Sequence, residues 1–174
     1  MKRGFEDLAF ALWLTGPPAS GKSTIAKALV SELERGGVKV QILESDSLRE
    51  ILTPHPSYTE GEREHFYRVL SYIGSLLWRN GVNVIFDATA NREVYRQYVA
   101  QLIPGLKVVF VTCSLETRQS RDLKGLYKAA GDGKITTLPG FQVAFEEPHH
   151  PDLTINTDKE SPAEAAKRIL HLLR

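Results

Sequence analysis

Cysteine is almost absent from this sequence: Cys113 is the only one among 174 residues. A single thiol cannot form an internal disulfide, and its place at the end of the apolar run LKVVFVTC predicts a small buried side chain. Charge of one sign is also lacking, because 22 Lys and Arg face 21 Asp and Glu and leave a net charge of +1. This balance excludes a generally polybasic protein and argues against a nucleic-acid partner, which usually needs an extended basic track.

Long hydrophobic runs are missing as well. No stretch approaches the roughly 18 consecutive apolar residues of a membrane span, so we expect no membrane partner. The first residues, MKRGFEDLAFALWLTG, carry Glu6 and Asp7 inside their short apolar stretch, unlike a removable signal, and we expect a cytoplasmic protein. With 42% hydrophobic and 25% charged residues and no linker-like tract, the chain has the composition of one soluble domain over residues 1–174.

Short apolar segments alternate with helical patterns along the chain. Strands are predicted at 10–14, 38–43, 82–86, 106–111 and 153–155, and helical spacing follows at 25–33, 62–79 and around 94–99. Near-continuous apolar strands are typical of a parallel sheet covered on both faces. The pattern therefore predicts a three-layer α/β domain with a parallel sheet of about five strands.

Two segments late in the chain carry clear local signals. Ser161, Pro162 and Glu164 predict the start of a final helix, with Ser as N-cap and Glu closing a capping box. Residues 121–150 instead mix basic side chains with Gly and Pro and lack periodicity, which predicts a lid over the site. The cations expected to serve this lid are Arg118, Arg121, Lys124 and Lys128.

A phosphate-binding loop follows the first strand. Residues 16–23 read GPPASGKS and match G-x-x-x-x-G-K-[ST] between a strand and a helix, the context that the motif requires. Lys22 is expected to reach the β- and γ-phosphates and Ser23 to ligate Mg²⁺, with ATP as co-substrate. The predicted ATP-binding residues are Gly16, Ala19, Ser20, Gly21, Lys22, Ser23 and Thr24.

Beyond the loop segment 15–24, the chain carries ESDSLR at 44–49, Arg63, RDLKGLYKA at 121–129, EEP at 146–148, PDL at 151–153 and NTD at 156–158. With these segments it resembles the adenylylsulfate (APS) kinase family over most of its length. The resemblance implies a P-loop NTPase fold and a transferase of sulfate assimilation, which moves the γ-phosphate of ATP to the 3′-hydroxyl of adenylyl sulfate and gives PAPS. It also implies a homodimer.

The resemblance assigns roles to three of these residues. Asp46 would act with Lys22 in catalysis, lying near the Mg²⁺ and orienting the acceptor hydroxyl, while Arg49 and Arg63 would bind the acceptor's anionic group. Lys124 would contact the acceptor from the lid. From the residues alone, Asp46 can also be read as a helix N-cap and Arg49 as a solvated helix side chain.

The chain departs from the family pattern in the predicted acceptor site. Phe66 stands where the family has Asn, and a buried helix Phe is the simpler interpretation of it. Tyr58 and Phe141 are candidates for the stacking aromatics of the acceptor site. The family's Ser-Pro loop is replaced by DATANRE at 87–93, where Asp87 is either a further carboxylate of the Mg²⁺ site or a helix cap.

These departures keep other functions open. A kinase of the same fold could phosphorylate a different hydroxyl acceptor, either a small molecule or a polynucleotide end. The Asp-Ala-Thr sequence after the third strand is similar to the corresponding sequence of polynucleotide-kinase-type and related small-molecule kinases. A third interpretation is an ATP-binding regulatory module without acceptor chemistry.

Overall fold

A five-stranded sheet forms the centre of the computed structural model, which describes residues 9–174. Its strands are β1 (Ala11–Thr15), β2 (Val40–Glu44), β3 (Asn83–Asp87), β4 (Lys107–Thr112) and β5 (Leu153–Asn156). Their order is β2-β3-β1-β4-β5, and every neighbouring pair is parallel. The predicted parallel sheet is therefore confirmed.

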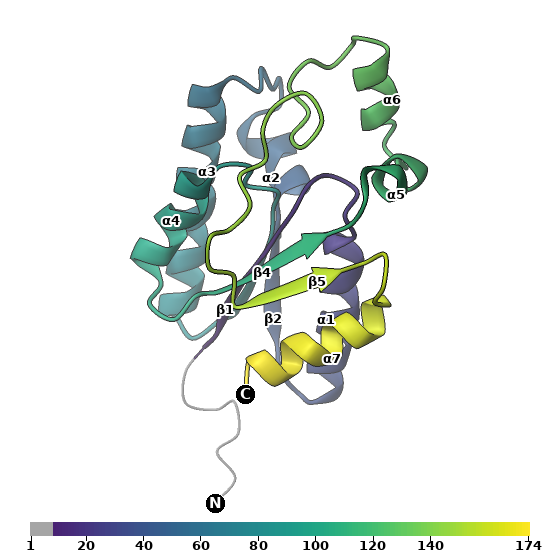
Figure 1. Ribbon diagram of the computed structural model, residues 1–174. Helices are drawn as coiled ribbons and strands as arrows, with labels where there is room; N and C mark the ends of the chain where they lie inside the picture. Colours follow the sequence, from purple (N-terminus) through teal and green to yellow (C-terminus); the bar gives the residue numbers. More distant parts are fainter. Residues whose placement is uncertain (1–8) are drawn as a thin grey trace, which may run out of the picture.

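Helices cover both faces of the sheet and complete the predicted three layers (Figure 1). One face packs against α1 (Lys22–Arg35) and α7 (Pro162–Leu172), and the other against α3 (Glu60–Arg79) and α4 (Glu93–Leu102). Side chains of β1 alternate between the two cores: Leu12 and Leu14 join the α1/α7 side, whereas Trp13 joins the α3/α4 side.

The predicted start of the final helix is confirmed. Ser161 Oγ accepts from the Glu164 N–H at 3.3 Å, and the Glu164 carboxylate accepts from the Ser161 N–H at 2.8 Å, so the capping box is complete. Pro162 occupies the first turn, where its missing N–H costs nothing.

Two short helices are not among the predicted elements, α5 (Leu115–Ser120) and α6 (Leu126–Gly131), and a third, α2 (Ser45–Leu52), is implied only by the alternative interpretations of Asp46 and Arg49. Each spans only one or two turns, too little chain for a hydrophobic period to emerge. Helix α6 lies inside the predicted lid, above the sheet in Figure 1.

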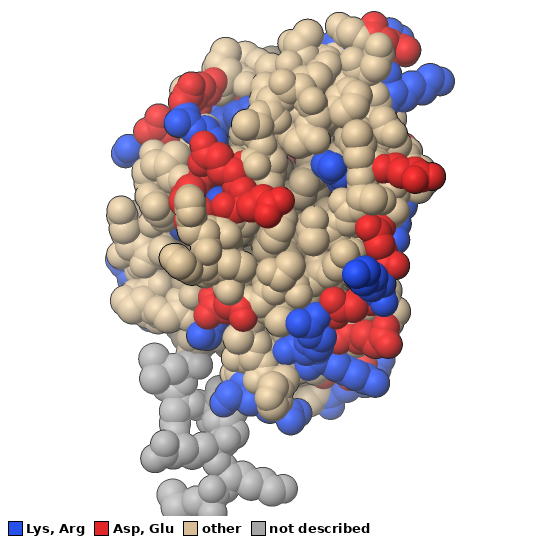
Figure 2. Space-filling view, viewed as in Figure 1, with Lys and Arg blue, Asp and Glu red and all other residues tan. Residues whose placement is uncertain are grey.

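Charge and hydropathy of the described part agree with the composition. None of its helices is long and apolar enough to cross a bilayer. On the face shown in Figure 2, Lys and Arg side chains lie among Asp and Glu rather than in one continuous basic track.

Close packing of α3 on β3 depends on Gly74. A Cβ at this position would lie 2.1 Å from Cζ of Phe86 and 3.2 Å from Cδ1 of Leu43. We therefore expect Gly74→Ala to lower the free energy of unfolding by about 1–3 kcal/mol through overpacking, measured by urea denaturation. Gly61, on the same helix, has open space around it, so Gly61→Ala should be neutral or slightly stabilising. Equal effects of the two changes would contradict this view of the packing.

Candidate active site

The site lies where neighbouring parallel strands end at one edge of the sheet. Leu14 of β1 pairs with Asp87, and Glu44 of β2 pairs with the same residue of β3. The loop after β1 and the first turn of α2 therefore meet beside Asp87. Ligands of open α/β sheets bind at this edge, next to the strand where the order reverses.

The phosphate loop has the backbone that its glycines predict. Gly16 has φ +155°, and a Cβ there would lie 2.1 Å from the Val111 carbonyl oxygen. Lys22 Nζ curls back over the loop and donates to the carbonyl oxygens of Gly16 and Pro17, both at 2.9 Å. Lys22 as a residue is only 8% exposed in this position. Its ammonium thus already lies inside the loop that would cradle a phosphate.

Burial sets the protonation of this lysine. The pKa of Lys22 falls from 10.5 to about 8, because desolvation disfavours the ammonium more than the charges of Asp87 and Asp46 favour it. An anionic ligand in the loop would restore the charged form.

Asp87 is the buried acid of the site. It is 4% exposed at the end of β3. Burial raises its pKa, although the charge of Lys22 and a hydrogen bond from Ser23 oppose the rise. The alternative interpretation as a helix cap is wrong, because the N-cap of α4 is Arg92.

These oxygens fit Mg²⁺. Ser23 supplies a hydroxyl next to a carboxylate that is costly to ionise without a cation, and Mg²⁺ prefers such hard oxygen ligands. Within residues 9–174, no three His, Cys, Asp or Glu side chains converge as a preformed metal site. A Mg²⁺ ion that is held largely by water and substrate phosphates needs no such cluster.

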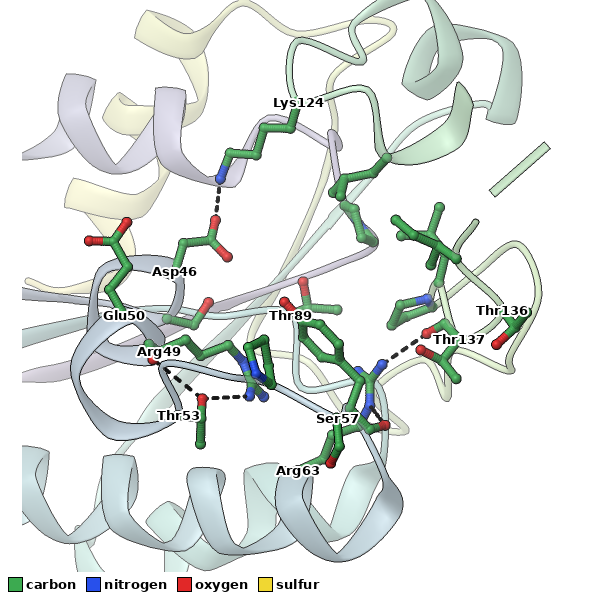
Figure 3. A pocket seen from close by; sticks show the side chains of 18 of the residues that line it. Asp46, Arg49, Glu50, Thr53, Ser57, Arg63, Thr89, Lys124, Thr136 and Thr137 are labelled. Carbon is green, nitrogen blue, oxygen red and sulfur yellow. Dashed lines mark hydrogen bonds and ion pairs between the residues drawn. The ribbon is translucent and has the colours of Figure 1, made fainter. Parts of the chain in front are cut away.

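Asp46 faces the lid. It lies in the first turn of α2, whose N-cap is Glu44, so the interpretation of Asp46 as a cap is wrong. Its carboxylate pairs with Lys124 across 78 residues of chain (Figure 3). Burial lowers the pKa of Lys124, but the hydrogen bond and charge of Asp46 outweigh it and raise that pKa overall. The two side chains remain 62% exposed, so their ion pair is exchangeable.

A cavity of about 660 Å³ opens beside the phosphate loop. Its wall unites α2, the start of α3 and the lid, as Figure 3 shows. Of the predicted site residues, it brings together Asp46, Arg49, Tyr58, Arg63 and Lys124. A cavity lined by four cationic and two acidic side chains next to a phosphate loop can hold an anionic acceptor against the terminal phosphate of a nucleotide.

The two predicted acceptor arginines are both fixed in this wall. Only 11% of the Arg49 side chain is exposed, so its interpretation as a solvated helix residue is wrong. Arg63 donates from Nε to the Tyr58 carbonyl at 3.0 Å and from Nη2 to the Thr137 carbonyl at 2.8 Å. Burial lowers the pKa of Arg63, but a guanidinium stays charged at physiological pH. Arg63 therefore links α3 to the lid.

Other predicted residues lie outside this cavity. Phe141 packs edge-on against Tyr127, with ring centroids 5.7 Å apart, because the turn at 138–143 directs it away from the lining residues. Arg118 donates to the Gly140 carbonyl, and Arg121 donates to Thr157. Lys128 is exposed on α6.

The structure adds residues that the sequence did not single out. Lys134, Thr137 and Leu138 line the same cavity from the lid. Composition marks their segment as basic and glycine-rich, but without periodicity nothing indicates which side chains turn inward. A second cavity of about 450 Å³ adjoins the first through Tyr58 and Arg63.

Comparison with known families gives a match over most of the chain. Residues 8–156 match the family described as adenylylsulphate kinase. A probable adenylyl-sulfate kinase from Pyrococcus abyssi is 36% identical over 161 residues, 92% of each chain. The adenylyl-sulfate kinase of Picosynechococcus is 33% identical, covering 97% of this chain and 95% of its own.

Solved structures share the architecture. The APS kinase of Mycobacterium tuberculosis in complex with AMPPNP and APS superposes with a TM-score of 0.90 at 28% identity, over 95% of this chain and 98% of that one. A hexameric APS kinase from Thiobacillus denitrificans has a TM-score of 0.71 at 23% identity and covers 97% of this chain and 29% of that one, a likeness of fold.

Nucleotide binding should follow the titration of Lys22. Bound phosphate favours the ammonium form of Lys22. Above the pKa of the free protein, where Lys22 is neutral, ATP binding therefore takes up one proton. Affinity for ATP should then fall about tenfold between pH 7 and pH 9, as Lys22 titrates near pH 8. Calorimetry in buffers of different ionisation enthalpy measures both effects. Lys22→Met should bind ATP weakly and without this pH dependence, and a wild-type affinity that stays constant to pH 9 would contradict the assignment.

Proposed function

The chain belongs to the adenylylsulfate kinase family, and from this premise we propose how its residues transfer the γ-phosphate of ATP to the 3′-hydroxyl of adenylyl sulfate. The enzyme is an ATP-dependent kinase that uses Mg²⁺ and produces PAPS. The observation that carries the residue assignments is the 660 Å³ cavity, which joins Asp46, two arginines and a lid lysine beside the phosphate loop.

The phosphate loop binds ATP. Its backbone N–H groups and the N-terminus of α1 hold the phosphates, and Lys22 turns from the loop carbonyls to the transferring phosphoryl group. Ser23 and Asp87 would hold Mg²⁺, with Asp46 close to it. When bound, the ion neutralises charge on the phosphate oxygens.

The cavity binds the acceptor, adenylyl sulfate. Arg49 and Arg63 bind the phosphosulfate oxygens, and the Tyr58 ring provides the aromatic surface for the base. Phe141 has no part in this proposal, because its ring packs against Tyr127. Leu138 supplies the apolar contact from the lid instead.

Asp46 orients the attacking hydroxyl. Its carboxylate is held by Lys124 before substrates bind, and the acceptor hydroxyl displaces that contact. Lys124 is then free to face the developing negative charge, while the rest of the lid limits access of water. Transfer needs little covalent chemistry from the protein, so this placement of charges is its main contribution.

Family membership decides between the acceptors that the DATANRE loop left open: adenylyl sulfate is the substrate, and a polynucleotide end or a regulatory role is set aside. We further propose that the chain acts as a single kinase domain. A homodimer and a cytoplasmic location remain predictions.

Turnover tests the function directly. Release of ADP from Mg-ATP should depend on adenylyl sulfate, and mass spectrometry should find one added phosphate on that acceptor. Reactions without acceptor, with nucleosides and with a 5′-hydroxyl oligonucleotide serve as controls. Phosphorylation of one of these controls in place of adenylyl sulfate would overturn the assignment.

Replacing one acid separates catalysis from binding. Asp46→Asn should lower kcat by about 100-fold or more while ATP affinity changes little, because the amide keeps the shape but cannot accept a proton. Single-turnover kinetics and calorimetry measure the two quantities. Glu34→Gln, a change at an exposed carboxylate of α1, should leave both unaffected. Parallel loss of ATP binding and turnover in Asp46→Asn would make Asp46 a binding residue.

A further inference from the structure

Arg49 packs against the ring of Phe66, which the sequence indicates only as a buried helix residue. Its guanidinium carbon is 3.8 Å from the centroid of the Phe66 ring, and the Tyr58 ring lies on it at 5.4 Å. Phe66 is 1% exposed in the core beneath the cavity. The prediction that Phe66 is a buried helix residue is thus confirmed. Its ring face also contacts the Arg49 guanidinium.

The polar contacts of Arg49 are long. Nη1 forms an ion pair with Glu62 Oε1 at 3.4 Å and donates to Thr53 Oγ1 at 3.5 Å. The other oxygen of Glu62, Oε2, accepts from the N–H and hydroxyl of Ser57 at 2.5 and 2.7 Å. Two such long hydrogen bonds do not fix a side chain with four rotatable bonds.

An aromatic ring orients a guanidinium without consuming its hydrogen-bond donors. The cation is attracted by the negative ring face, and this attraction uses none of the five N–H groups of the guanidinium. A bidentate carboxylate would take two of these donors, whereas Glu62 contacts only Nη1. Because the bonds to Glu62 and Thr53 share this one nitrogen, Arg49 keeps N–H groups for an anion in the cavity that it lines.

We propose that Phe66 is a positioning residue: its ring face holds Arg49 in the orientation that binds the anionic end of the acceptor. This inference rests on the proposed function and adds a residue that never touches the substrate. It also explains how the site can bind an anion although Phe66 stands where the family pattern has an Asn: Phe66 orients Arg49, and Arg49 contacts the anion.

Graded fluorination of Phe66 tests the inference. Incorporating 4-fluoro-, 3,5-difluoro- and 3,4,5-trifluorophenylalanine weakens the negative ring face stepwise with little change of shape. The KM for adenylyl sulfate should rise at each step, to about tenfold for the last member and for Phe66→Leu. The kcat and the KM for ATP should change less than twofold, a split that loss of packing alone would not produce.

Two controls separate orientation from packing. Leu70→Val removes volume one turn along the same buried helix face, at a side chain without a ring face to hold a cation, and should lower Tm without changing the KM for adenylyl sulfate. A double-mutant cycle of Phe66→Leu and Arg49→Met, read by urea denaturation, measures the contact without any substrate.

The outcomes are distinct. A stepwise rise in the KM for adenylyl sulfate, with coupling in the cycle, supports the inference. A constant KM across the fluorinated series in an active enzyme overturns it and leaves Phe66 a core residue, even if Phe66→Leu fails to fold. Absence of adenylyl sulfate turnover in the wild type overturns the proposed function, and this inference with it.

Discussion

Parallel pairing of β1 with β3 is the constraint on which the site depends. It places Asp87 beside Leu14, near the end of β1 and just before the phosphate loop. On the other side, β2 leads directly into α2. Side chains alternate along a strand, so a slip of one residue would exchange the buried Asp87 with Phe86, which packs against α3. The apolar cores on both faces fix this register, and through it the separation of the nucleotide and the acceptor.

The lid is joined to this rigid edge by polar contacts and by a small apolar cluster. Lys124 reaches Asp46, and Arg63 reaches the Thr137 carbonyl. Exposed ion pairs contribute little stability, whereas the buried Tyr127 packs near Ala19 and donates to the Pro18 carbonyl at 3.0 Å, which ties the lid to the phosphate loop. The contacts of Lys124 and Arg63 involve residues that the proposed mechanism assigns to substrates. In that mechanism, substrates take over these two polar contacts while the apolar cluster stays in place.

Regular elements and the phosphate loop were predictable because their signals are local. A run of apolar residues, a glycine pattern and a capping box each specify backbone over a few positions, and the five strands and the start of α7 agree with them. Side-chain direction in irregular chain was not predictable. Phe141 and Lys134 lie in the same segment, yet only Lys134 lines the cavity. Which of them turns inward depends on the fold of 132–143 around Tyr127, a tertiary contact with no counterpart in composition.

The DATANRE loop shows why a changed sequence need not change the acceptor. Its residues 88–90 are anchored through their backbone, and of the three only Thr89 lines the cavity. The anchors are Trp13 Nε1 to the Ala88 carbonyl at 3.0 Å, Thr15 Oγ1 to the Thr89 carbonyl at 2.7 Å, Arg96 to the Ala90 carbonyl and the Ala90 N–H to the Tyr67 hydroxyl at 2.8 Å. These donors and acceptors come from β1, α3 and α4, three elements of one packed core. A backbone held on several sides keeps its place when its side chains are exchanged. Substrate specificity then depends on the charged residues around the loop, such as Arg49 and Arg63, and on the Phe66 ring that orients Arg49.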